Sequence, residues 1–210
     1  MRKIEKGTEP ASWLTYRLTP NAQYERTADL AESLLKEQGY LCAYCMRQIP
    51  ARDGNSNETT RIDHILSREK HEALQLDYSN MVICCPGAIS ADFHCDKRKA
   101  ENDITIPLHS IYIENSITYN KSDGTIKCEN DDWDDQMNEI LNLNNSMLKE
   151  NRKRTLLGVV KELSRRKQWK ASDIRKMIEA WSNKGSNGKF KPYNGIVIWY
   201  LNKKLKQLQK

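Results

Sequence analysis

The sequence predicts a mainly helical α+β fold, with a small metal-binding unit between an N-terminal helix and a C-terminal helical region. Apolar residues recur at helical spacing on both flanks, whereas the middle of the chain breaks into short segments with Cys, His, Gly and Pro. Six cysteines in a chain without an export signal indicate reduced thiols and metal ligands before disulfides. The expected regions are 1–40, 41–103, 104–132 and 133–210.

Composition narrows the class of partner. The formal net charge is +6, from 34 basic and 28 acidic residues, which is compatible with a polyanion such as nucleic acid. Met1 to Pro10 is charged, and nowhere do eighteen apolar residues follow one another. We therefore expect a cytoplasmic protein with no membrane partner.

The first two flanking elements can be assigned from local pattern. A helix is expected over 22–38, because apolar residues recur there at helical spacing and Gly39 follows as a C-terminal stop. Residues 104–132 contain Pro107 and the turn Ser122-Asp123-Gly124 between short β-branched stretches. This region is expected to be an extended excursion or a hairpin.

The C-terminal region, 133–210, is expected to be helical. Leu148, Leu156, Val160 and Leu163 form one apolar stripe, a second follows over 174–181, and 196–208 reads as a last apolar helix after a Gly/Asn/Lys-rich loop. No catalytic motif falls in this region. We expect it to bind a protein partner, and the metal-binding unit to fold without it.

The cysteines predict a structural zinc site. Cys42 and Cys45 have the spacing of two thiolates on one ion, and Cys84, Cys85 and Cys95 follow about forty residues later. A tetrahedral site needs one of the adjacent pair together with Cys95. A redox pair is the alternative for the first two cysteines, although no thioredoxin-like pattern surrounds them. Cys128 lies outside the set and is expected to be inert.

Three residues between and after these cysteines suit phosphodiester hydrolysis. The imidazole of His64 titrates near neutral pH and can take a proton from water. Asp63 and Asp96 offer hard oxygens that select Mg²⁺ or Mn²⁺. Asp63 and His64 are adjacent, so a bend or strand end is required if both serve one phosphate. Lys99 and Arg98 are candidates for phosphate binding, with plain surface cations as the alternative.

The order of these motifs is specific. Ile62-Asp63-His64-Ile65, then Tyr78-Ser79-Asn80-Met81, then Cys95 followed by Asp96-Lys97-Arg98-Lys99, resembles the HNH, or ββα-metal, endonucleases. The resemblance implies two strands and a helix, a role for Asn80 in orienting the catalytic loop or His64, and Cys85 as the zinc ligand of the adjacent pair. Many family members carry Asn or His where this chain has Asp96, so His94 is a competing ligand for the catalytic metal.

Short motifs in the flanks extend the resemblance to nearly the whole chain. They include Leu141-Asn142-Leu143-Asn144 and Phe190-Lys191-Pro192-Tyr193. These resemble the PtuB family, the HNH subunits of Septu and retron-associated anti-phage defence systems. The resemblance implies a nuclease acting on DNA, or on RNA such as tRNA, under the control of a PtuA-like ABC-type ATPase. In retron systems a reverse transcriptase and its RNA–DNA product would be further partners.

A second function class competes with the nuclease. A zinc-dependent nucleic-acid-binding or adaptor module would need the cysteines but not Asp63, His64, Asn80 and Asp96 in register. The presence of all four favours the enzyme.

Overall fold

The computed structural model describes residues 1–51, 59–89, 91–165 and 168–209, and shows an α+β fold with two small antiparallel sheets. The predicted fold class is confirmed at this level. Residues 52–58 and 90 of the expected unit 41–103, and residues 166–167 and 210 of the C-terminal region, lie outside the described residues.

Helices and short strands alternate along the chain. The N-terminal part contains α1 (Ala11–Arg17) and α2 (Ala28–Glu37), and the central part contains β1 (Arg61–His64), 3-10 turns at Glu72–Leu74 and Tyr78–Asn80, β2 (Met81–Cys84) and α3 (Cys95–Lys99). Next come α4 (Ile111–Ser116), β3 (Ile117–Tyr119), β4 (Ile126–Cys128), α5 (Asp131–Asp135) and a π-helical turn (Gln136–Ile140). The chain ends in α6 (Ser146–Ser164), α7 (Ala171–Ser182) and α8 (Asn194–Leu208).

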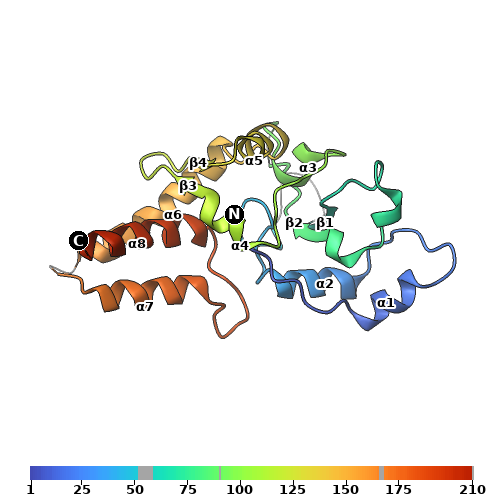
Figure 1. Cartoon of the computed structure of the whole chain (residues 1–210), viewed down its shortest axis with the longest axis horizontal. Coiled ribbons are helices and arrows are strands. Elements are labelled where there is room, and N and C mark those ends of the chain that lie inside the picture. The colour runs from blue at the N-terminus through green and yellow to red at the C-terminus, as the bar shows by residue number, and fades with distance from the viewer. Residues whose placement is uncertain (52–58, 90, 166–167, 210) are drawn as a thin grey trace.

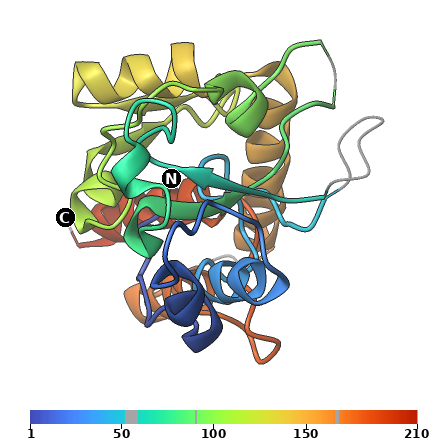
Figure 2. The same ribbon diagram turned by 90° about the vertical axis from the view of Figure 1, so that its right-hand side faces the viewer.

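The two sheets lie in different parts of the molecule. Strands β1 and β2 pair antiparallel, with His64 opposite Met81 and Arg61 opposite Cys84. Strands β3 and β4 form the hairpin expected within 104–132. In Figure 1 the β1–β2 sheet, α1 and α2 occupy one end of the molecule, and α7 and α8 occupy the other. Figure 2 looks onto the β1–β2 end, where α1 and α2 (blue) lie below the sheet.

Three local features differ from the sequence prediction. Helix α2 begins at Ala28 because the Thr27 side chain caps it, accepting a hydrogen bond of 3.3 Å from the backbone N–H of Leu30. The preceding residues are therefore extended instead of helical. Helices α1 and α4 were not predicted. Both are short, and helices of one or two turns carry too few apolar positions to show a helical period.

A single buried apolar cluster connects all parts of the described chain. It contains Trp13 of α1, Leu34 of α2 and Val82 of β2, and continues to Leu156 of α6 and Leu201 of α8. Burying such side chains is the main favourable term in folding. The expected regions therefore share one core instead of each having its own.

The start of the C-terminal region forms hydrogen bonds with the segment around Cys95. The backbone N–H of Cys95 donates to the Leu141 carbonyl at 2.9 Å, and Arg98 donates to the Glu139 carbonyl at 3.1 Å. Asn142 donates to the Asp92 carboxylate at 2.8 Å. These bonds conflict with the expectation that the metal-binding unit folds without residues 133–210.

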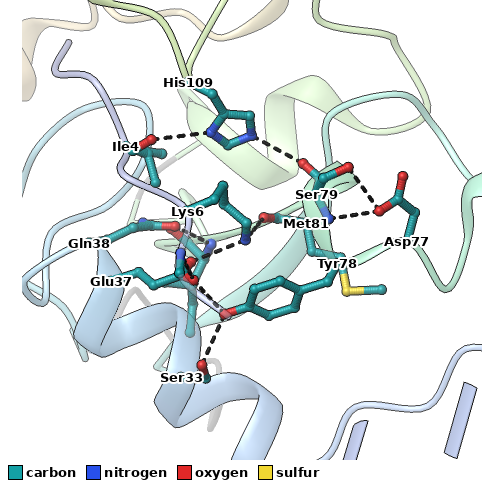
Figure 3. Close-up of polar contacts among 12 residues, drawn as sticks. Ile4, Lys6, Ser33, Glu37, Gln38, Asp77, Tyr78, Ser79, Met81 and His109 are labelled. Atoms are coloured by element: carbon teal, nitrogen blue, oxygen red, sulfur yellow. Dashed lines mark hydrogen bonds and ion pairs between the residues drawn. The ribbon is translucent and has the colours of Figure 1, made fainter. Parts of the chain in front are cut away.

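A polar network fixes the N-terminal segment to the β1–β2 sheet (Figure 3). The Lys6 ammonium donates to the Met81 carbonyl at 3.1 Å and pairs with Glu37 of α2 at 3.1 Å, above the ring of Tyr78. The Tyr78 hydroxyl donates to Glu37 at 2.7 Å. Because Tyr78 and Met81 flank Asn80, this network supports the turn that carries Asn80.

Candidate active site and metal centre

Cys42, Cys45, Cys85 and Cys95 come together in one buried cluster whose sulfur atoms all lie within 4.8 Å of one another. The Sγ–Sγ distance is 3.8 Å between Cys42 and Cys95, and 3.7 Å between Cys45 and Cys85. A tetrahedral zinc ion with Zn–S bonds of about 2.3 Å places its ligands about 3.8 Å apart. The four cysteines could therefore hold a metal ion such as zinc.

Local hydrogen bonds aim these thiols at one point. The Cys42–Cys45 segment is a tight turn in which the Met46 N–H donates to the Cys42 carbonyl at 3.1 Å. The Ala43 N–H donates to the Ile83 carbonyl at 3.1 Å, which joins this turn to β2 just before Cys85. Cys95 is the first residue of α3. A turn, a strand end and a helix start thus converge on the cluster.

The structure also separates Cys85 from its neighbour. The Cys84 thiol lies 3.6 Å from the Arg61 carbonyl, on the adjacent strand, and Cys128 is buried in β4. Successive side chains of a strand point to opposite faces, so only one of the adjacent pair can reach the cluster. The cluster therefore contains Cys85, as expected, and not Cys84.

Charge in the cluster is unbalanced. Burial acts to raise the pKa of Cys42, but hydrogen bonds from Cys45, Cys85 and Cys95 bring that pKa well below its ordinary value. The pKa of Cys95 is raised, first by burial and then by its cysteine neighbours. Several thiolates cannot coexist here without a cation. A bound divalent metal would supply that charge.

A second site lies in a cavity of about 670 Å³ between β1 and α3. It contains Asp63, His64, Asp96 and Lys99 from the predicted set. It is also lined by residues that no motif indicated, including Tyr24, Arg26, Arg61 and Arg68. Arg61 shares a strand face with Asp63, a signal that the period of two could have revealed.

His64 is oriented as a base. It is the last residue of β1, which is the strand end that the Asp63-His64 pair requires. Its Nε2 lies 2.9 Å from the carbonyl oxygen of Gln75, and because a carbonyl only accepts, Nε2 carries the proton and Nδ1 is the acceptor. Burial lowers the pKa of His64 to about 4. The imidazole is therefore neutral at pH 7 and able to accept a proton.

Asp63 is held by two donors. It accepts hydrogen bonds from the hydroxyl of Tyr44 and, at 3.3 Å, from the ammonium of Lys99. Burial raises the pKa of Asp63, although Lys99 acts against that shift. Lys99 is itself 1% exposed and donates to the His64 carbonyl at 2.8 Å. The predicted contact of Lys99 with a phosphate stays a prediction, and it would require this ammonium to leave Asp63.

Asp96 faces the same cavity from the first turn of α3. Its carboxylate lies 3.7 Å from the guanidinium of Arg61. Burial raises the pKa of Asp96 to about 7, and the neighbouring charge of Asp63 acts in the same direction. Two acidic groups with raised pKa values in one cavity mark a place where a divalent cation would be stabilised.

Asn80 braces the loop that orients His64. Its side-chain oxygen accepts from the Leu66 N–H at 2.9 Å, and its amide donates to the carbonyls of Leu66 at 3.0 Å and Leu74 at 3.3 Å. Leu74 directly precedes Gln75, the residue whose carbonyl holds His64. Asn80 therefore fixes the backbone beside Gln75, and its role in a reaction stays a prediction.

Other predicted residues lie away from the cavity. The ring of His94 is buried, with Nδ1 3.2 Å from the Cys95 sulfur and 3.9 Å from the Cys85 sulfur. It therefore lies on the cysteine side of α3. Arg98 reaches the Glu139 carbonyl instead, and His71 pairs with Asp103 at 3.1 Å. Asp96 and His94 were the two candidates for the second ligand of the catalytic metal. Among the described residues that line the cavity, Asp96 is present and His94 is not.

No protein-family model matches the chain, and comparison with curated proteins finds no match. Among the helices that the structure describes, none has both the length and the apolar character needed to cross a membrane.

Proposed function

We propose that this chain is a metal-dependent endonuclease of the HNH type that hydrolyses phosphodiester bonds of nucleic acid. The observation that carries the proposal is the cavity between β1 and α3, where a neutral, oriented His64 faces the same space as Asp63 and Asp96. The nearby cluster of four cysteines, in which Cys85 follows β2 and Cys95 begins α3, supports it.

In the proposed reaction, His64 acts as general base. Its Nδ1 takes a proton from a water molecule while the water oxygen forms a bond to phosphorus. The bond from phosphorus to the leaving sugar oxygen breaks, and that oxygen takes up a proton from solvent. Gln75, which accepts from Nε2, keeps the imidazole in the tautomer that this step needs.

Asp63 and Asp96 would hold the catalytic Mg²⁺ or Mn²⁺. When bound, such an ion neutralises charge that builds on the phosphate oxygens. Asp96 loses its proton on binding, and Arg61, 3.7 Å from its carboxylate, favours the charged form. Zinc is assigned to the cysteines because thiolates select it, whereas carboxylates select the harder ions.

The resemblance to the PtuB family extends the proposal to biological context. We infer an effector subunit of an anti-phage defence complex, with a PtuA-like ABC-type ATPase as regulator. A retron reverse transcriptase with its RNA–DNA product is a further partner in systems of that kind. DNA is the first substrate to test. RNA is the second, because the same hydrolytic chemistry can act on both backbones.

The test is incubation of the full chain, alone and with an ABC-type ATPase of the PtuA family. Plasmid DNA and total RNA are supplied with Mg²⁺, Mn²⁺ or EDTA. Cleavage that needs the divalent ion and is lost in His64→Ala supports the proposal. Equal cleavage by His64→Ala would point to a contaminating nuclease, and no cleavage in any condition would contradict the enzyme.

One observation favours a non-cleaving zinc-dependent module as the second candidate. Both oxygens of Asp63 are engaged, one by Tyr44 and one by Lys99. If Lys99 permanently takes the place of a cation, the cavity binds no divalent ion. Titration with Mn²⁺ distinguishes the two functions: saturable binding lost in Asp96→Asn supports the nuclease, and its absence supports the module.

The proposed ATPase contact is assigned to the C-terminal helices. Leu157 of α6 is 51% exposed and Leu208 of α8 is 49% exposed, so apolar surface remains there. A pull-down with Leu157→Glu, after confirming normal zinc content, tests this face better than truncation because Leu141 supports Cys95. Undiminished recovery would place the contact elsewhere.

A further inference from the structure

Tyr24 is fixed in the wall of the cavity from three sides. Its ring lies edge-on to His64, with centroids 4.7 Å apart at an interplanar angle of 86°, and Trp13 packs behind it at 6.4 Å. The Tyr24 N–H donates to the Gln75 side chain at 3.1 Å. The same Gln75 holds His64 through its carbonyl. Tyr24 and His64 are therefore positioned by one shared residue.

The Tyr24 hydroxyl is an available donor. Burial raises the pKa of Tyr24 to about 12, so the hydroxyl keeps its proton at neutral pH. Tyr16, Tyr40 and Tyr44 each donate their hydroxyl to an acceptor within the chain. Within residues 1–51, 59–89, 91–165 and 168–209, no hydrogen bond to the Tyr24 hydroxyl is found. Its half-buried donor lines the cavity without a partner from the described chain.

Arg68 lies over the ring of Tyr24. Its guanidinium is 4.5 Å from the centre of the Tyr24 ring, a cation–π geometry that restricts the side chain. Arg61 is paired with Asp96, and Arg26 donates to Thr60 at 3.2 Å. In the part of the chain that the structure describes, no acidic partner of Arg68 is found. Its N–H edges therefore remain available to a ligand.

These groups together suit a phosphate. A guanidinium presents paired N–H donors to two phosphate oxygens, and a neutral hydroxyl adds a third donor without repelling a nearby metal ion. Asp63 and Asp96 lie in the same cavity and would repel an anion that had no such partner. Ionised carboxylates only accept hydrogen bonds, so a phosphate beside His64 needs donors from other residues.

We propose that the Tyr24 hydroxyl and the Arg68 guanidinium bind the scissile phosphate of the nucleic acid beside His64. That the bound phosphate is the one cleaved rests on the proposed function, but the binding contact can be tested without cleavage. Tyr24 belongs to the segment before α2, so the N-terminal region completes the site that β1 and α3 begin. Arg68 supplies charge, and Tyr24 supplies a neutral donor and aligns Arg68.

The experiment measures binding of a fluorescein-labelled 20-base-pair DNA duplex by anisotropy in EDTA, at several salt concentrations. Arg68→Gln should weaken binding and reduce the slope of log affinity against log salt by about one, the loss of one phosphate contact. Tyr24→Phe keeps the ring against His64 and Arg68, so the slope should stay unchanged. Loss of a hydrogen bond to a charged group should lower affinity or cleavage rate about 10- to 100-fold.

Two matched variants control for nonspecific effects. Tyr40→Phe removes a hydroxyl bonded to Glu32, and Arg154→Gln removes an exposed cation on α6, both outside the cavity. Both should bind and cut as the unaltered chain does. If Tyr24→Phe and Arg68→Gln match these controls in binding and cleavage, the contact is wrong. Binding in EDTA, with no cleavage in Mg²⁺ or Mn²⁺ either alone or with the ABC-type ATPase, would overturn the proposed function and leave the anisotropy result decisive for the contact. No binding by the unaltered chain would overturn both.

Discussion

The cysteine cluster and the cavity beside His64 share helix α3, which carries Cys95 and Asp96, but they differ in what completes them. In the cluster, four thiols lie within 4.8 Å of one another, with two sulfur pairs 3.7 and 3.8 Å apart. In the cavity, Asp63 is held by Tyr44 and Lys99, and Asp96 lies near Arg61. The first site is closed, and the second is an open cavity of about 670 Å³.

This difference separates a structural role from a chemical one. A closed site that uses every ligand contributes folding energy, whereas an open site must leave room for substrate. The groups of the cavity are satisfied by protein partners, and under the proposed function some of those contacts would rearrange when metal and nucleic acid bind. The comparison predicts large effects on stability at the cysteines, and effects mainly on rate at His64.

The largest effect is expected from removing a cysteine ligand. Cys42→Ser should lose about one zinc per chain and unfold the surrounding turn, since structural zinc sites contribute about 10 kcal/mol or more. Cys84→Ser is the matched control, because its thiol faces the Arg61 carbonyl. Metal analysis and thermal melting measure both. Full zinc content in Cys42→Ser, or zinc loss in Cys84→Ser, would contradict the ligand set.

A smaller effect, confined to rate, is expected at His64. His64→Ala should lower cleavage about 10²- to 10⁴-fold, the usual contribution of a general base, while zinc content and melting change little. His109→Ala is the control, since His109 contacts the Ser79 carbonyl and is not among the described residues that line the cavity. Single-turnover cleavage measures the difference. Comparable rates for the two variants would remove His64 from the reaction.

The same comparison explains what could be predicted from sequence. The cysteines come as short-range pairs, and ligand spacing along the chain reports directly on local geometry. Asp63 and His64 were expected to need a strand end, and His64 does end β1. Tyr24 and Trp13 have no such signal, because their approach to His64 depends on how α1 and the following segment fold across the sheet.

Burial was harder to predict than proximity. Lys99 was expected to bind a phosphate or to be a surface cation, but its ammonium is enclosed between Asp63 and the His64 carbonyl. The hydrogen bond from the Cys95 N–H to the Leu141 carbonyl was also not predicted, because a backbone hydrogen bond between distant segments leaves no side-chain pattern. Tertiary contacts of this kind are not visible in a single sequence.

The burial of Lys99 leads to a stability prediction inside the cavity. Lys99→Met should destabilise the fold by about 3 kcal/mol, because removing one partner of a buried pair leaves the Asp63 charge uncompensated. Lys97→Met changes an exposed residue on the same helix and should have little effect. Urea unfolding measures both. Adding Asp63→Asn to Lys99→Met should restore part of the loss, and failure to do so would place the effect in packing alone.

The smallest effect is the pH dependence of divalent binding in the cavity. Burial, aided by Asp63, raises the pKa of Asp96 to about 7, so the folded, metal-free chain holds a proton there in mildly acidic solution. A metal ion must displace that proton. Mn²⁺ affinity should therefore fall about tenfold for each pH unit below about 7 and level off above it. Titrations of Mn²⁺ at pH 6, 7 and 8, read by electron paramagnetic resonance, measure this dependence, and Asp96→Asn should bind weakly at every pH. As a control, zinc at the cysteines should remain bound throughout. Equal Mn²⁺ affinity at pH 6 and pH 8 would show that Mn²⁺ does not displace a proton from Asp96.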